Sequence, residues 1–175
     1  MQQNGYQQCF RARLATCVAL LEDLRRLTER MLSNLPTQSF SFRGGETSKQ
    51  AYCVLCSYLL RAEEKKKAMN AAVLSIAEMR VELARQFANL SIERLTDPSS
   101  DLGETCDAQK RLLAQMDAFA ESARIFDETV LRRFFFRLGE ESDAEHDGER
   151  CNVSQIRALC TAFLTQLNEQ LQKRF

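Results

Sequence analysis

The stretch from Thr47 to Thr96 constrains the fold most, because its fifty residues contain neither Gly nor Pro. Apolar side chains recur in it at every seventh position, and we call these the first row: Leu55, Ala62, Met69, Ile76, Leu83 and Leu90. Such spacing, sustained without an internal stop signal, is typical of one long helix. At ~1.5 Å rise per residue, the helix would be about 75 Å long.

A second apolar row lies beside the first and consists of Leu60, Leu74, Val81, Ala88 and Leu95. The positions four residues after the first row alternate between apolar side chains and the cations Lys66, Arg80 and Arg94. Five successive charged residues at 63–67 encircle the helix at one level. There we expect Lys66 to bury its stem and extend its ammonium group to solvent, since long cationic side chains often do so. A joint that is solvated on all sides is the alternative.

The six Gly and two Pro residues punctuate the chain between apolar-periodic segments. They divide it into four predicted helices at about 6–35, 47–96, 104–138 and 152–174, with an acidic loop at 139–151. The sequence therefore predicts an all-α fold, an antiparallel four-helix bundle with coiled-coil-like packing and an over-long second helix, in one domain over 1–175. The first and fourth helices could pack end to end along the second. Otherwise half of the long helix is left unpaired, and a second chain must cover it.

Each of the other predicted helices carries a core-facing stripe. In the first it consists of Leu14, Cys17, Leu21, Leu24, Thr28, Met31 and Leu35. In the third it consists of Leu112, Met116, Phe119, Ala123, Phe126, Val130 and Phe134, and Gly139 is predicted to follow the helix end. In the fourth it consists of Ile156, Cys160, Phe163, Leu167 and Leu171.

Catalytic motifs are not visible in the sequence. The single histidine, His146, lies in the predicted acidic loop, where nothing positions it beside a nucleophile or a second metal ligand. Cys53 and Cys56 have C-x-x-C spacing, but the chain lacks a second ligand pair at comparable spacing, which favours core packing over a metal site. We therefore expect no enzyme activity, no cofactor, no metal and no small-molecule substrate.

Three features of the sequence bear on where the protein is located: its apolar runs, its first residues and its cysteines. The uncharged stretch from Gln50 to Leu60 is too short to cross a bilayer, which needs about 20 residues. Residues 1–5 lack the basic and apolar regions of a secretory signal. Seven cysteines without framework spacing fit reduced thiols better than a disulfide scaffold. We expect an intracellular protein, cytoplasmic or nuclear.

The function predicted is that of a helical protein–protein interaction module, an adaptor or a subunit of a larger cytoskeletal, kinetochore-like or trafficking assembly. Its partners would be other proteins, or a second copy of the chain, bound through helical faces. The candidate partner-binding residues are Phe40, Phe42, Lys66, Arg80, Arg132, Arg133, Phe135 and Phe136. Phe40 and Phe42 could instead cover the end of the bundle. Ser142, followed by Asp143 and Glu145, resembles an acidic-directed phosphorylation site.

The alternative function is binding of nucleic acid through basic helix faces. The cations available for it are Arg25, Arg26, Arg30, Lys65, Lys66, Lys67, Arg132, Arg133 and Arg137. Zero formal net charge and a pI near 6.6 disfavour this function, because affinity for phosphate depends on how many cations the protein presents.

Overall fold

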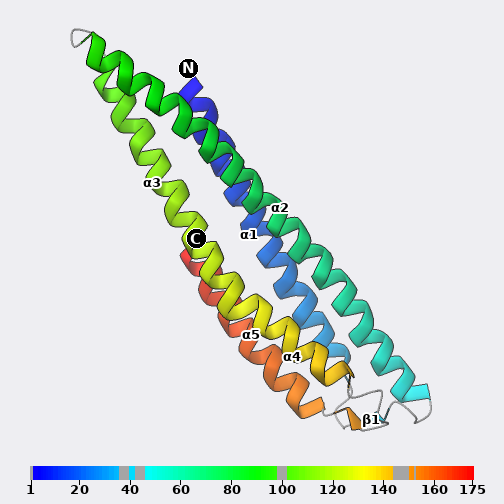
Figure 1. Ribbon diagram of the computed structural model, residues 1–175. Coiled ribbons are helices and arrows are strands. Elements are labelled where there is room, and N and C mark those ends of the chain that lie inside the picture. The colour runs from blue at the N-terminus through cyan, green and yellow to red at the C-terminus, as the bar shows by residue number, and fades with distance from the viewer. Residues whose placement is uncertain (1, 36–39, 42–45, 98–101, 144–149, 152) are drawn as a thin grey trace. The chain divides into compact units, whose positions relative to one another are not determined.

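The computed structural model describes residues 2–35, 40–41, 46–97, 102–143, 150–151 and 153–175, and Figure 1 shows how they fold. The elements in chain order are α1 (Gln2–Asn34), β1 (Phe40–Ser41), α2 (Glu46–Thr96), α3 (Gly103–Phe126), the π-helical turn η1 (Asp127–Leu131), α4 (Arg132–Asp143), β2 (Arg150–Cys151) and α5 (Val153–Lys173). The predicted all-α antiparallel bundle with an over-long second helix is confirmed. The two short strands pair antiparallel, with Phe40 opposite Cys151 and Ser41 opposite Arg150.

Helix α2 continues without a break through the charged residues 63–67. Lys66 is half-buried there, and its Nζ lies 5.3 Å from the centre of the Phe135 ring. A cation at this distance from an aromatic face is attracted by the electron density of the ring. The lysine stem is therefore partly covered, as the sequence predicts, but its ammonium group lies near an aromatic ring in place of extending freely to solvent.

The two apolar rows of α2 have different environments. Five members of the first row, from Leu55 to Leu83, are buried, and Leu90 is half-buried. In the second row Leu60 is 66% exposed, Leu74 60%, Val81 66% and Leu95 81%, and Ala88 is exposed as well. The first row therefore forms part of the core, and the second faces solvent.

The chain forms two compact units. Unit 1 comprises Met1–Cys17 and Met69–Arg124, and unit 2 comprises Val18–Ala68 and Ile125–Phe175. The later part of α1 and all of α5 thus belong to the same unit. The end-to-end placement of the first and fourth helices along the second is therefore wrong, because α1 is long enough to contribute to both units.

Unit 1 is built from the beginning of α1, the later part of α2, and α3. The Phe10 ring meets the Phe119 ring edge-on, with centroids 6.1 Å apart. Gln86 Nε2 donates a hydrogen bond of 3.0 Å to the Tyr6 hydroxyl. Arg80 donates through Nε and Nη2 to the Asp117 carboxylate, and this hydrogen bond raises the pKa of Arg80. Three aligned stripes and a polar edge therefore hold this unit together.

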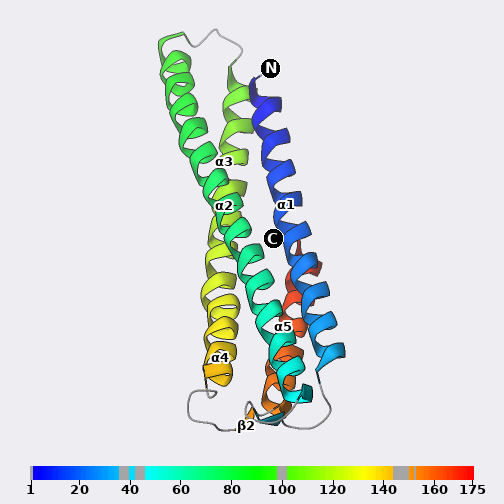
Figure 2. The same ribbon diagram turned by 90° about the vertical axis from the view of Figure 1, so that its right-hand side faces the viewer.

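Unit 2 contains the later part of α1, the beginning of α2, η1, α4 and α5. The α1 and α2 segments run side by side in both views (Figures 1 and 2), and the buried hydroxyls of Thr28 and Tyr58 join them at 2.7 Å. Phe134 and Phe163 join α4 to α5, with parallel rings and centroids 3.8 Å apart. The α5 stripe is buried at Ile156, Cys160, Phe163 and Leu167, but at the last turn Gln170 is more buried than Leu171.

The π-helical turn η1 displaces one member of the predicted stripe of the third helix. Up to Phe126 the predicted residues are buried, but the next buried residue is Leu131, while Val130 is only half-buried. The Arg132 backbone N–H donates to the Asp127 carbonyl, a five-residue step in place of four. The extra residue of this turn moves the buried position from Val130 to Leu131, so the prediction that Val130 belongs to the stripe is wrong, whereas Phe134 is buried as predicted.

Helix α4 continues past Gly139 to Asp143, so the predicted helix end at Leu138 and the start of the acidic loop at Gly139 are wrong. Gly139 does not adopt a left-handed backbone conformation, and the space around its Cα is open. A glycine is tolerated within a helix at a modest cost, and Glu140 and Glu141 after it favour the helix. Residues 144–149 of the predicted loop, with His146, lie outside the described residues.

Candidate functional site

The surface of unit 2 contains a groove of about 310 Å³ between η1–α4 and α5, here called the Phe136 groove. Its lining residues come from three elements: Thr129 and Val130 from η1, Arg133, Phe134, Phe136 and Arg137 from α4, and Leu159, Ala162, Phe163 and Gln166 from α5. Figures 1 and 2 show α4 and α5 side by side along this length. The groove is thus mainly apolar, with two guanidinium groups in its lining.

Three successive phenylalanines of α4 have different environments because they point in different directions around the helix. Phe134 is 5% exposed and stacks on Phe163, which is 1% exposed. Phe135 is half-buried and meets the Phe163 ring edge-on at 6.5 Å. Phe136 is 68% exposed. Two of the three rings therefore stabilise the fold, and the third is available to a partner.

The two arginines of the groove, Arg133 and Arg137, are both exposed. They lie four residues apart, so that one face of α4 presents both. Among the described residues neither has an ion-pair partner. Arg132, by contrast, donates from Nε to Asp127 at 2.8 Å, over the same five-residue step as the π-helical turn. The positive charge available to a ligand in this groove therefore belongs to Arg133 and Arg137.

The predicted partner-binding residues do not form one site. Arg133 and Phe136 meet in the Phe136 groove, and Lys66 lies against Phe135, whereas Arg80 is ion-paired in unit 1. The backbone of Phe40 pairs with β2, but its side chain and all of Phe42 lie outside the described residues. Ser142 is in the last turn of α4, and its side chain lies outside the described residues too.

Sequence reasoning did not identify the contribution of α5 to this groove. Leu159, Ala162 and Gln166 flank the buried stripe of α5 rather than belonging to it. Their spacing of three and four residues marks a common helix edge. That spacing was a usable signal, but only contact with α4 shows which edge of α5 faces the groove.

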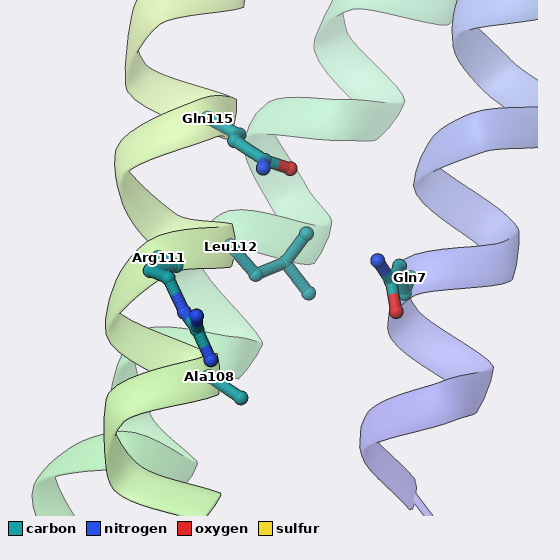
Figure 3. Close-up of a pocket in the computed structure, with 5 residues that line it drawn as sticks. All are labelled: Gln7, Ala108, Arg111, Leu112 and Gln115. Atoms are coloured by element: carbon teal, nitrogen blue, oxygen red, sulfur yellow. The ribbon is translucent and has the colours of Figure 1, made fainter. Parts of the chain in front are cut away.

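Unit 1 has a groove of about 340 Å³ between α1 and α3, and Figure 3 shows its lining. Gln7 extends from α1 toward α3, which contributes Ala108, Arg111, Leu112 and Gln115. Two carboxamides and one guanidinium group can hydrogen-bond a polar group, but they supply neither a nucleophile nor a proton-transfer group at neutral pH. This groove also lacks an exposed aromatic ring, and the Phe136 groove is therefore the stronger candidate.

The cysteines differ from the prediction in one respect. Cys17, Cys106 and Cys160 are buried, but Cys53 is exposed and Cys56 half-buried. Core packing of both C-x-x-C thiols is therefore wrong, because Leu55 and Tyr58 occupy the buried positions of that turn. The described part of the chain contains no group of three or more His, Cys, Asp or Glu residues that could hold a metal ion.

The titratable groups with the largest shifts lie in the core. Burial raises the pKa of the Cys17 thiol to about 11 and that of Cys160 to about 12. Burial also raises the pKa of Tyr58. A nucleophilic cysteine needs a lowered pKa. These two thiols are therefore protonated at neutral pH and suited to packing.

No helix within the described residues combines the length and the apolar character that a membrane crossing requires. No family model, no curated protein and no solved structure matches this chain.

Proposed function

We propose that this chain is a non-enzymatic protein–protein interaction module, acting as an adaptor or as a subunit of a larger intracellular assembly of the cytoskeletal, kinetochore-like or trafficking kind. One observation carries the proposal: Phe136 is largely exposed in a mainly apolar groove that Arg133 and Arg137 also line. Aromatic and arginine side chains are enriched in the centres of protein interfaces and dominate their binding energy.

The chemistry of the groove defines the partner that it would bind. Phe136, Val130 and Leu159 offer apolar contact, and two arginines without described ion-pair partners offer charged hydrogen bonds. A helix or extended segment with an apolar side chain flanked by carboxylates would satisfy both. Burying an exposed apolar side chain contributes roughly 1.5–3 kcal/mol, so Phe136 would be the main anchor.

The alternative, nucleic-acid binding, receives less support from the arrangement of cations. Arg26 lies within ion-pair distance of Glu22 and Asp23, Lys65 pairs with Asp23, and Arg132 pairs with Asp127. Neighbouring carboxylates reduce the positive potential that attracts phosphate groups. Several of the cations that the sequence offered for phosphate binding are thus partly neutralised by this chain's own acids.

The proposal is tested by placing a photo-crosslinking amino acid at position 136 in cells that express the chain. We expect a discrete protein adduct whose yield falls several-fold when Arg133→Glu and Arg137→Glu are introduced together, because the carboxylates of the partner would then be repelled. The measurement is the adduct band on a denaturing gel, followed by mass spectrometry of the attached peptide.

Two matched controls keep this experiment specific. The same crosslinker at Ile125, which is exposed in unit 2 but outside the groove, is expected to give no such adduct. The paired substitutions Arg61→Glu and Lys67→Glu reverse two exposed charges of the same unit and are expected to leave the adduct unchanged. Equal adducts at 125 and 136 contradict the proposal, and an adduct to nucleic acid at 136 favours the alternative.

A further inference from the structure

The outer face of α2 in unit 1 is an apolar seam with coiled-coil spacing. Its principal residues are Leu74, Val81, Ala88 and Leu95, each seven residues after the last and all exposed. Ile92, which is 60% exposed, extends the apolar surface. The seam runs about 32 Å along the helix at ~1.5 Å per residue. Monomeric proteins rarely leave such a continuous row uncovered.

The residues between the principal positions are small. Ala77, Ala84 and Ser91 follow Leu74, Val81 and Ala88 at three-residue steps. Together the two sets have the alternating three- and four-residue spacing of the a and d positions of a coiled coil. Leu74 and Val81 are large and the intervening set is small, so a second helix can approach closely when each of these two side chains lies opposite a small one; Ala88 is itself small.

The charges beside the seam indicate which helix fits it. Glu78 and Arg85 lie on the same edge of the seam, seven residues apart, and each directly follows one of the small residues. Arg85 uses Nη2 to contact both oxygens of Glu82, at 2.6 and 2.7 Å. Within the described part of the chain, the other guanidinium nitrogens of Arg85 and the carboxylate of Glu78 have no hydrogen-bond or ion-pair partner.

We propose that this seam pairs with the same seam of a second copy of the chain, with the two α2 helices antiparallel. Val81 of each copy then lies opposite Ala84 of the other, Ala77 opposite Ala88, and Leu74 opposite Ser91. In this register Glu78 of each copy faces Arg85 of the other, so that the two-fold axis produces two ion pairs. The same chain thus supplies both charges of each ion pair, so a second copy is sufficient as the partner.

The parallel arrangement fits poorly. In a parallel in-register pair, the residue on one edge of the seam meets the residue five positions away on the opposite edge of the other copy. Arg80 would then lie beside Arg85 of the second copy, twice. Like charges in such positions are destabilising. The charge pattern therefore favours the antiparallel pair, although Asp117 offsets part of the Arg80 charge.

This pairing is independent of the Phe136 groove, which belongs to unit 2, and the experiments on the two surfaces can fail separately. The short seam is expected to give a weak dimer, with a dissociation constant on the order of micromolar, because small interfaces rarely exceed the entropy cost of association by much. Sedimentation velocity of the full chain across a concentration series measures it directly.

Charge reversal tests the register. Glu78→Arg alone and Arg85→Glu alone are each expected to weaken the dimer by roughly tenfold, because each replaces two attractions with two repulsions. The double variant Glu78→Arg/Arg85→Glu is expected to restore the original dissociation constant. A matched control is Glu121→Arg/Arg124→Glu on α3, which reverses an exposed ion pair of the same unit and is expected to change nothing.

Three outcomes overturn the proposal. The first is a chain that stays monomeric up to the highest concentration reached. The second is a dimer that Arg85→Glu strengthens, since that result identifies the parallel pair, where the introduced carboxylate would attract Arg80 of the second copy. The third is a dimer whose dissociation constant none of these charge reversals alters. Because all the substituted side chains are exposed or half-buried, circular dichroism is expected to show an unchanged helical fold for each variant.

Discussion

At the residue scale, the two buried hydroxyls of unit 2, those of Thr28 and Tyr58, depend on each other unequally. The Thr28 hydroxyl donates to the Leu24 carbonyl at 2.7 Å, so the hydrogen bond between Thr28 and Tyr58 is donated by Tyr58. Tyr58 thus depends on Thr28 for its acceptor, whereas Thr28 keeps a partner without Tyr58. The need of the Tyr58 hydroxyl for an acceptor explains why Thr28 stands among Leu and Met residues in the α1 stripe.

Substituting the two partners is expected to have unequal effects. Tyr58→Phe removes one hydrogen bond and is expected to cost roughly 0.5–1.5 kcal/mol of unfolding free energy. Thr28→Val leaves a buried hydroxyl without an acceptor and is expected to cost more, about 1–3 kcal/mol. Urea denaturation measures both values. In the double variant the Thr28→Val cost should largely vanish, and equal costs for the two single variants would contradict the assigned donor.

The buried thiols predict how stability depends on pH. The folded protein holds Cys17 and Cys160 at pKa values of about 11 and about 12, above the 9.0 of an unperturbed thiol. An acid whose pKa is raised on folding contributes its full stability below the unfolded pKa and loses it as pH rises toward the folded pKa. The unfolding free energy is therefore expected to fall from about pH 9 upward, as measured by urea denaturation between about pH 7 and about pH 10.5.

Variants separate these thiols from other alkaline effects. Cys17→Ala/Cys160→Ala is expected to flatten the decline above about pH 9, leaving the part due to Tyr58, whose pKa burial also raises. Cys53→Ala removes an exposed thiol and is expected to leave the decline unchanged. A decline of the same size in all three proteins would show that the buried thiols do not cause it.

At the scale of the elements, the extra residue of η1 predicts an unusual tolerance to deletion. Removing Val130 converts the five-residue step into an ordinary four-residue step, while Phe126, Leu131 and Phe134 remain on one face. We expect the deletion to change the unfolding free energy by no more than about 1 kcal/mol, because a half-buried side chain is exchanged for regular helix geometry. Thermal or urea denaturation provides the measurement.

Deleting an exposed residue from the regular part of the same run is the matched control. Without Ala114, either Met116 and Phe119 or the residues before them must leave the core, because one residue rotates a helix by about 100°. The expected cost is about 3 kcal/mol or more. If the two deletions lower the unfolding free energy by similar amounts, then η1 does not accommodate an additional residue in this helix.

The sequence predicts the helices better than it predicts their faces. The seven-residue spacing identifies α2 and its buried row because a core stripe repeats wherever the helix is regular. That spacing cannot show where a π-helical turn adds a residue, and so it places Val130 in the core in place of Leu131. Nor does apolar character tell which of two neighbouring rows is covered, since that depends on the packing of other helices. The second row of α2 is visible in the sequence, but its exposure is not.

The candidate site is predictable only in part for the same reason. Phe136 stands out because three phenylalanines in succession cannot share one stripe, and Arg133 stands out because it directly precedes them. Which of them is exposed depends on the rotation that η1 introduces and on where α5 lies. Gly139 misleads the prediction of the helix end, because a glycine within a helix and one after its end look alike in sequence.

At the scale of the whole molecule, the division into two units makes the single-domain prediction testable. Helices α1 and α2 each contribute a segment to both units. If the chain unfolds as one domain, Leu83→Ala in unit 1 is expected to lower the protection of α5 amides in unit 2 by the global cost of about 2–5 kcal/mol. Native-state hydrogen exchange measures this. Unchanged protection in α5 would show that the units unfold separately.

The buried cysteines have a consequence for handling the protein in air. The chain has seven cysteines, and three of those in the described residues are sheltered in the core. An oxidant meets Cys9 and Cys53 first, while Cys17, Cys106 and Cys160 become reachable only when the core opens. Oxidation of an opened chain would then join thiols that the fold keeps apart. Refolding is therefore expected to be complete in the presence of a reductant and to fail without one, as non-native disulfides accumulate.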